Sequence, residues 1–145
     1  MTTAISSFGT LVKIGDGASS ETFTTIAELR DITPPELASD TEDVTSHSST
    51  GGYEEVIPDG VLKTGEVTFE INYVPTATTH NATAGLIKDW KNKTKRNFQL
   101  VYPDSGNSTW VFAAYVTKFA SKAPVKGVLR ADVTLKLTGQ PTALV

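Results

Sequence analysis

Cysteine is absent from this sequence of 145 residues, which excludes disulfide frameworks and thiol chemistry and leaves packing or assembly as the sources of stability. No apolar run approaches the roughly 20 residues that a membrane-spanning helix needs. Residues 1–7 lack a basic region followed by an apolar stretch, so we expect no secretory signal. We therefore do not expect a membrane among the partners of this protein.

Side chains that would do chemistry are also few. Only two histidines occur, and His47 lies in a polar stretch without recognised metal-ligand spacing, so it is better interpreted as a solvated loop residue. Glu54 and Glu55 would point to opposite faces of an extended chain. Glu66 and Glu70 would share the wet face of a strand. We expect no catalytic residue, no metal site and no cofactor, and we predict that the protein is not an enzyme.

The charges are spread unevenly along the chain. Residues 1–60 contain eleven acidic side chains and two basic ones, a balance of −9. Residues 61–145 contain five acidic and eleven basic side chains, a balance of +6. Such polarity suits head-to-tail association, in which one surface meets a different surface of the next copy. The alternative is that both signs mingle on one surface once the chain folds.

Hydrophobic residues make up 39% of the chain and charged residues 20%, which is typical of one globular domain over residues 1–145. Apolar and polar residues alternate over Glu66–Val74 and Val128–Thr138, the pattern of strands with one buried face. Further strands are predicted over Phe8–Ile14, Thr22–Ile32, Asn97–Tyr102 and Thr109–Ala120. Many short strands separated by Gly and Pro turns predict a mainly β protein, an antiparallel sandwich or barrel with one flanking helix.

The flanking helix is predicted over Asn81–Lys95. Leu86, Ile87 and Trp90 lie at offsets that share one helical face, so we expect them to anchor the helix in the core. Trp90 is the largest of the three, and its replacement by alanine would cost about 3–5 kcal/mol if the ring is buried.

A long segment, residues 40–65, separates two predicted strands and contains no apolar residue between Ser46 and Gly52. Loops of this length in compact domains are functional or disordered. Tyr53, Val56 and Ile57 follow directly, so we hypothesise that the loop docks on a neighbouring copy; the alternative is a floppy loop without a partner. Residues 1–8 and 140–145 are predicted to be an N-terminal arm and a short C-terminal tail.

The order of these pieces resembles the major tail tube proteins of long-tailed, siphovirus-type bacteriophages. The resemblance covers nearly the whole chain and is carried by Phe23–Pro34, Asp43–Thr45, Tyr53–Pro58, Gly65–Phe69, Phe98–Pro103, Val116–Phe119 and the ending VTLKLTGQPT over Val133–Thr142. It implies a virion protein, made in the bacterial cytoplasm, that self-assembles into stacked hexameric rings. The rings would form the tail tube through which DNA is ejected. Some members carry a further C-terminal immunoglobulin-like domain, which we expect this chain to lack.

In such a tube the long loop would make contacts between subunits and rings, through Asp43, Thr45, His47, Tyr53, Glu54, Glu55 and Ile57. An acidic or neutral lumen would let DNA pass without specific binding, and Glu66, Glu70 and Asp132 are the candidates to face it. The resemblance further implies tape measure, terminator and tail-tip proteins as partners. Two alternatives stay open at this point: a closely related tail component, and a β-sandwich binding or adhesin module that displays the 40–60 loop.

Overall fold

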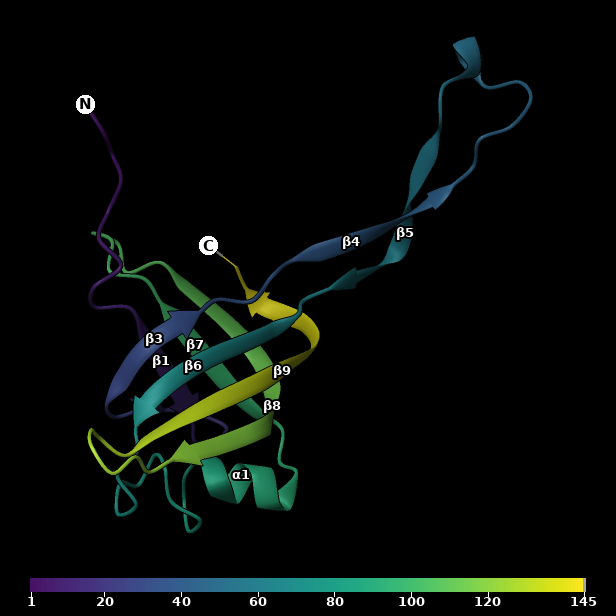
Figure 1. The fold of residues 1–145 in the computed structure, drawn as a ribbon. Helices are drawn as coiled ribbons and strands as arrows, with labels where there is room; N and C mark the ends of the chain where they lie inside the picture. The colour runs from purple at the N-terminus through teal and green to yellow at the C-terminus, as the bar shows by residue number, and fades with distance from the viewer. Residues whose placement is uncertain (145) are drawn as a thin grey trace.

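The computed structural model describes residues 1–144, and nearly all of its regular secondary structure is β-strand (Figure 1). In chain order the elements of this part are β1 (Leu11–Gly15), β2 (Phe23–Thr25), β3 (Leu29–Thr33), β4 (Ala38–Asp43), the 3₁₀ turn η1 (Thr50–Gly52), β5 (Val56–Lys63), β6 (Glu66–Asn72), α1 (Leu86–Asn92), β7 (Arg96–Val101), β8 (Thr109–Lys122) and β9 (Arg130–Ala143). Residues 1–8 have no regular secondary structure and are exposed.

Seven strands form one antiparallel sheet in the order β2-β1-β7-β8-β9-β6-β3. The sheet curls on itself, so that β6 and β9 cross in front of β1 and β7 in Figure 1. The long strand β8 belongs to both layers, because its first half pairs with β7 and most of its length pairs with β9. The mainly β architecture with one flanking helix, predicted from the sequence, is confirmed.

The core lies between the two layers and is supplied by alternate residues of each strand. Its buried apolar members are Val12, Ile14, Ile26, Val67, Phe69, Ile71, Leu86, Phe98, Leu100, Phe112, Ala114, Val116, Ala131, Val133, Leu135 and Leu137. The period of two in β6 and β9 therefore identified the inward faces of both strands correctly. Burying these side chains is the main stabilising contribution available to a chain without disulfides.

The predicted single strand Thr22–Ile32 was wrong, because the chain turns sharply in its middle. β2 and β3 lie at opposite edges of the sheet, and Glu28 between them has a positive φ of 59°. Two buried side chains hold the corner: Thr79 Oγ1 accepts a hydrogen bond from the Ala27 N–H at 3.2 Å, and His80 Nε2 lies 2.8 Å from the Ala27 carbonyl oxygen. The corner directs the chain from one edge of the curled sheet to the other.

Helix α1 is shorter than predicted, and its buried face differs. It begins at Leu86 and has seven residues, with Lys93 in the left-handed conformation at its end. Leu86 is buried as expected, and Ile87 is partly buried. Trp90 is 54% exposed, so its assignment as the core anchor was wrong. The inward position three residues after Leu86 belongs to Asp89 instead.

Asp89 is buried because an arginine reaches it from the next strand. Its side chain is 1% exposed, and its Oδ1 accepts a hydrogen bond from Arg96 at 3.0 Å. The same guanidinium donates to the Gly15 carbonyl through Nε at 2.9 Å and through Nη2 at 2.6 Å. Burial raises the pKa of the Asp89 carboxyl despite the nearby cation. This network ties α1 and β7 to β1.

The last strand continues beyond the point at which the sequence predicts its end. The sequence predicts a strand that ends at Thr138 and a tail over residues 140–145, but β9 extends to Ala143, which pairs with Val111 after a register shift. Gly139 adopts a φ of +70°, which a glycine tolerates inside a bulged strand. Most of the predicted tail is therefore strand, while Val145 lies outside the described residues.

Candidate assembly surfaces

A two-stranded ribbon leaves the body of the protein where the sequence predicts a loop. β4 and β5 pair antiparallel from Ala38↔Lys63 to Asp43↔Val56, and Figure 1 shows them extending well beyond the sheet. We call residues 38–63 the arm. All of its strand residues are exposed. A lone hairpin of this kind is only marginally stable in water, so its docking on another surface would be favourable.

The tip of the arm is tied by polar hydrogen bonds rather than by apolar burial. Thr45 Oγ1 accepts from the Glu55 N–H at 2.8 Å, and the Thr45 N–H donates to Asp43 Oδ1 at 2.8 Å. Ser49 Oγ donates to Glu55 Oε2 at 2.8 Å. The bonds from Thr45 lower the pKa of the Asp43 carboxyl. The tip is more ordered than its composition indicated, and the D-V-T turn signal could have revealed this.

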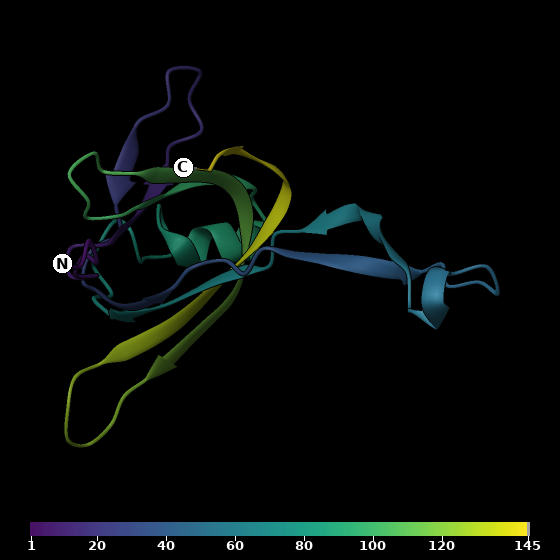
Figure 2. The same cartoon turned by 90° about the horizontal axis from the view of Figure 1, so that it is seen from above.

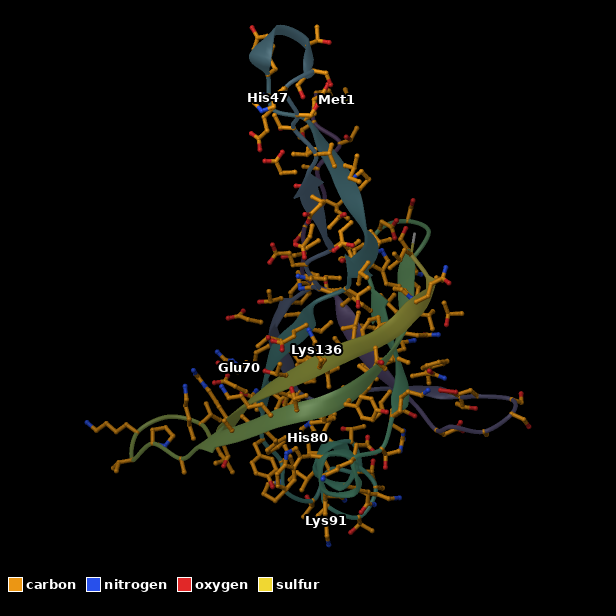
Figure 3. All side chains as sticks on the ribbon, turned by 90° about the vertical axis from the view of Figure 1, so that its right-hand side faces the viewer. Met1, His47, Glu70, His80, Lys91 and Lys136 are labelled. Carbon is orange, nitrogen blue, oxygen red and sulfur yellow. The ribbon has the colours of Figure 1, made fainter. Side chains whose placement is uncertain are left out.

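The structure places all seven predicted contact residues in or beside this tip. Asp43, Thr45 and Glu55 are brought together by the bonds just described. Tyr53 is 77% exposed, and the other predicted residues also face solvent; His47 is labelled at the far end of the arm in Figure 3. The sequence reasoning missed exposed apolar residues nearer the body, namely Leu37, Val61 and Leu62.

A hollow of about 730 Å³ lies at the base of the arm, between β5 and the end of β9. It is lined mainly by Leu37, Leu62, Pro141, Ala143 and Leu144. Leu62 and Leu37 are at least half exposed here. Apolar side chains of the arm and of the end of β9 therefore meet in this hollow, together with polar ones such as Lys63 and Gln140. The sequence prediction of a C-terminal tail over residues 140–145 did not reveal this.

The three predicted lumen residues lie on one polar face. This face belongs to β3, β6, β9 and the second half of β8, which we call the polar layer; Glu70 and Lys136 mark it in Figure 3. Glu70 pairs across the strands with Asp132, and Glu66 pairs with Lys136. All three carboxylates therefore lie along two adjacent strands.

Cations neutralise this acidic group. Arg30 Nε lies 2.9 Å from Glu70 Oε1, and Arg130 Nη1 lies 3.8 Å from the same oxygen. Lys122 Nζ lies 3.4 Å from Asp132 Oδ2. These side chains are partly exposed, so each pair contributes little to stability. The polar layer therefore carries interspersed positive and negative side chains and is not a uniformly acidic surface.

Two strand edges of the polar layer are open within residues 1–144. β3 pairs only with β6, so its other edge is free. β8 pairs with β7 only as far as Ala114, so its edge from Tyr115 to Lys122 is free on the side away from β9. Free edges expose unpaired N–H and C=O groups that template pairing with another chain.

Neither a metal centre nor a membrane segment emerges from the described residues. Within residues 1–144, no three His, Cys, Asp or Glu side chains are grouped so that they could hold a metal ion. In the same part of the chain, no helix is long and apolar enough to cross a bilayer.

Comparison with known proteins identifies the family. The family model of the lambda phage tail tube protein matches residues 8–144. Three solved structures share the fold. The tail of an empty gene transfer agent particle has a TM-score of 0.80 and 22% identity, covering 98% of this chain and 100% of that one. A subunit of the native gene transfer agent virion has a TM-score of 0.75 and 21% identity, covering 97% of this chain and 100% of that one. The tail tube of phage SPP1 has a TM-score of 0.63 and 11% identity, covering 90% of this chain and 73% of that one.

No curated protein matches the sequence. The family match nevertheless spans almost the whole chain, and it agrees with the free strand edges, the protruding arm and the resemblance noted in the sequence. The chain therefore belongs to the lambda phage tail tube protein family and is a structural subunit of the virion tail.

Proposed function

We propose that copies of this chain close into six-membered rings, and that the rings stack into a tube that conducts DNA during ejection. Six-fold symmetry is supported by the gene transfer agent tail, which has the same fold and was determined with C6 symmetry. Self-assembly gives the free strand edges and the exposed arm a partner of known chemistry, another copy of this chain.

The open edges of the polar layer carry this proposal. Within the layer, β3, β6, β9 and β8 alternate in direction, because each neighbouring pair is antiparallel. The free edge of β3 on one copy therefore meets the free edge of β8 on the next as another antiparallel pair. Four strands from each of six copies make a closed barrel of 24 strands, which removes every edge.

The polar face of this layer would then line the lumen. Glu66, Glu70 and Asp132 face it, but each lies close to a cation or opposite one. A lumen of alternating charge offers DNA neither a continuous basic track to bind nor a uniformly acidic wall. DNA would pass without specific binding. The arm, with its exposed Tyr53 and Ile57, would contact a neighbouring ring.

A tail tube has an interior and two ends, and each of these is a place for a further protein partner. A tape measure protein inside the tube, a terminator at one end and tail-tip proteins at the other are the partners that we propose. The protein acts as a structural element, and no reaction is assigned to it.

Engineered disulfides test the ring. The chain has no cysteine, so Asp31→Cys on β3 and Lys118→Cys on β8 introduce the only two thiols, one at each free edge. Assembled protein is oxidised and run on a non-reducing gel beside electron micrographs. We expect a ladder of covalent multimers that ends at six. Asp31→Cys with Lys91→Cys, which places the second thiol on α1, is the matched control and should give no such ladder.

The outcomes separate the parts of the proposal. Tubes without a ladder would refute the pairing of β3 with β8 and leave the tube function intact. A ladder ending at another number would refute the six-fold ring. Wild-type protein that forms neither rings nor tubes, even with the tail-tip proteins supplied, would refute the proposed function.

A further inference from the structure

The arm carries charge of almost a single sign. Residues 38–63 contain six carboxylates, Asp40, Glu42, Asp43, Glu54, Glu55 and Asp59, and one cation, Lys63, which pairs with Asp40. The arm also exposes half of Val56 and of Ile57. Its partner surface therefore has to supply cations together with apolar contact.

One surface of the same protein has this complementary character. We call residues 122–130, which join β8 and β9, the basic turn. It contains Lys122, Lys126 and Arg130 and no acidic residue. Val125 is fully exposed, and Val128 is 49% exposed. Lys122, Pro124, Lys126, Val128 and Arg130 line a hollow of about 540 Å³. Lys122 lies near Asp132 and Arg130 lies near Glu70, so within residues 1–144 Lys126 is the cation of this turn without an ion-pair partner. Two exposed valines beside it make the turn a candidate contact surface.

The strand register places the arm and the basic turn at opposite ends of the polar layer. β6 begins at Glu66, directly after the arm, and Glu66 pairs with Lys136. At the other end of β6, Asn72 pairs with Arg130, where the basic turn joins β9. Figures 1 and 2 show the arm and this turn pointing away from the body in opposite directions. A head-to-tail stack brings such ends together.

We propose that the acidic arm of one copy docks on the basic turn of a copy in the adjacent ring. Carboxylates of the arm pair with Lys126 and its neighbours, while Val56 and Ile57 cover Val125 and Val128. This inference rests on the proposed tube function and names the surface that receives the arm. It makes ring stacking salt-dependent, whereas ring closure through backbone pairing is not.

Helix α1 presents the competing basic surface, and its features fit the arm less well. Lys91, Lys93 and Lys95 are exposed there, but the exposed apolar group beside them is the single aromatic Trp90. α1 also packs on β8, and its Leu86 belongs to the core, so the helix does not extend the polar layer. It therefore supplies the charge without the paired aliphatic contact, and it serves as the control surface.

Charge reversal tests the docking. Lys126→Glu places a negative charge where the arm should dock, on an exposed turn whose folding does not depend on this side chain. We expect the critical concentration for tube growth to rise at least tenfold at low salt, with rings still present in sedimentation velocity runs. Lys91→Glu changes the charge equally on α1 and should leave tube growth unchanged.

A compensating reversal makes the test specific. Glu54→Lys, alone or with Lys126→Glu, reverses one arm charge, and the double variant should recover most of the lost tube growth. Normal tube growth by the Lys126→Glu protein would overturn the proposed docking surface. So would a loss of tube growth in Lys91→Glu at least as large as the loss in Lys126→Glu, provided that the wild type still forms tubes. Absence of rings in the wild-type protein would instead refute the tube function itself.

Discussion

Replacing Arg96 by methionine should be among the most destabilising changes outside the apolar core. Methionine keeps the aliphatic stem of the side chain and removes the cation that faces Asp89, which is 1% exposed. It also removes both donors to the Gly15 carbonyl. Breaking a buried ion pair from one side costs about 3–5 kcal/mol, because the remaining charge is left buried without compensation. For a chain of this size that corresponds to a melting temperature lower by roughly 10–15 °C.

Urea unfolding of the wild type, Arg96→Met, Asp89→Asn and the double variant measures the coupling energy between Arg96 and Asp89. Asp89→Asn removes the buried charge and should cost about 1–2 kcal/mol, because Arg96 keeps its bonds to the Gly15 carbonyl. The double variant, with Arg96→Met, should be more stable than the sum of the single losses predicts, by about 1–3 kcal/mol. Additive losses, or a cost below about 1 kcal/mol for Arg96→Met, would refute the description of a buried charge held by one cation.

The same pair predicts a pH dependence with a definite sign. Because burial raises the pKa of Asp89, the folded protein binds this proton more tightly than the unfolded chain. The contribution of Asp89 to stability is therefore fully present below its ordinary pKa and is lost as the pH rises through the raised value. The difference in unfolding free energy between wild type and Asp89→Asn should decrease over this window. A difference that is flat or increases with pH would contradict the assignment.

Three further changes probe other parts of the fold. Trp90→Ala should cost only about 1–2 kcal/mol of unfolding free energy in thermal melts, because half of the Trp90 side chain is already in solvent. A loss of about 3–5 kcal/mol would show that the ring is buried in the core after all. Gly65→Ala should cost more than about 1 kcal/mol, since its φ is +69° and a Cβ would lie 2.7 Å from the Glu36 carbonyl oxygen; an unchanged melt would exclude that crowding. The N–H and the hydroxyl of Ser108 both donate to the Asp104 carboxylate and lower its pKa, so Asp104→Asn should speed amide hydrogen exchange at Ser108. In the wild-type protein the same exchange should become faster, relative to an unstructured amide, as the pH falls through that lowered pKa. Equal exchange rates at Ser108 in the variant and the wild type would argue against the bond.

The alternating strands were predictable because each has one wet and one buried face. In β6 and β9 every second residue is apolar, and this pattern alone identifies the inward positions of Phe69 and Val133. The corner at Ala27 was not predictable in this way. Threonine and isoleucine favour strands on both sides of it, and the groups that hold it come from Thr79 and His80, some fifty residues away.

The sequence was sufficient to predict that the segment of the arm stands apart from the core, but it did not predict that this segment forms two paired strands. The polar run before Tyr53 marks a region that contributes nothing to the core. Its strands were missed because β4 has few residues that favour strands, and it is ordered by pairing with β5. The face of Trp90 was misassigned because apolar spacing alone placed Trp90 on the buried side with Leu86. In the structure the ion pair with Arg96, which comes from the next strand, turns Asp89 inward instead.

The position of β9 in the polar layer has a consequence for the order of events during synthesis. β9 is the last strand of the described chain, yet it lies between β6 and β8 and holds both. β3 can pair with β6 before β9 is made, but these two strands are joined to the second half of β8 only after β9 has left the ribosome and paired with both β6 and β8. Such non-local pairing is slow, so nascent chains expose no finished edge to their neighbours. A subunit thus becomes competent to polymerise only after β9 has been translated and has paired with β6 and β8.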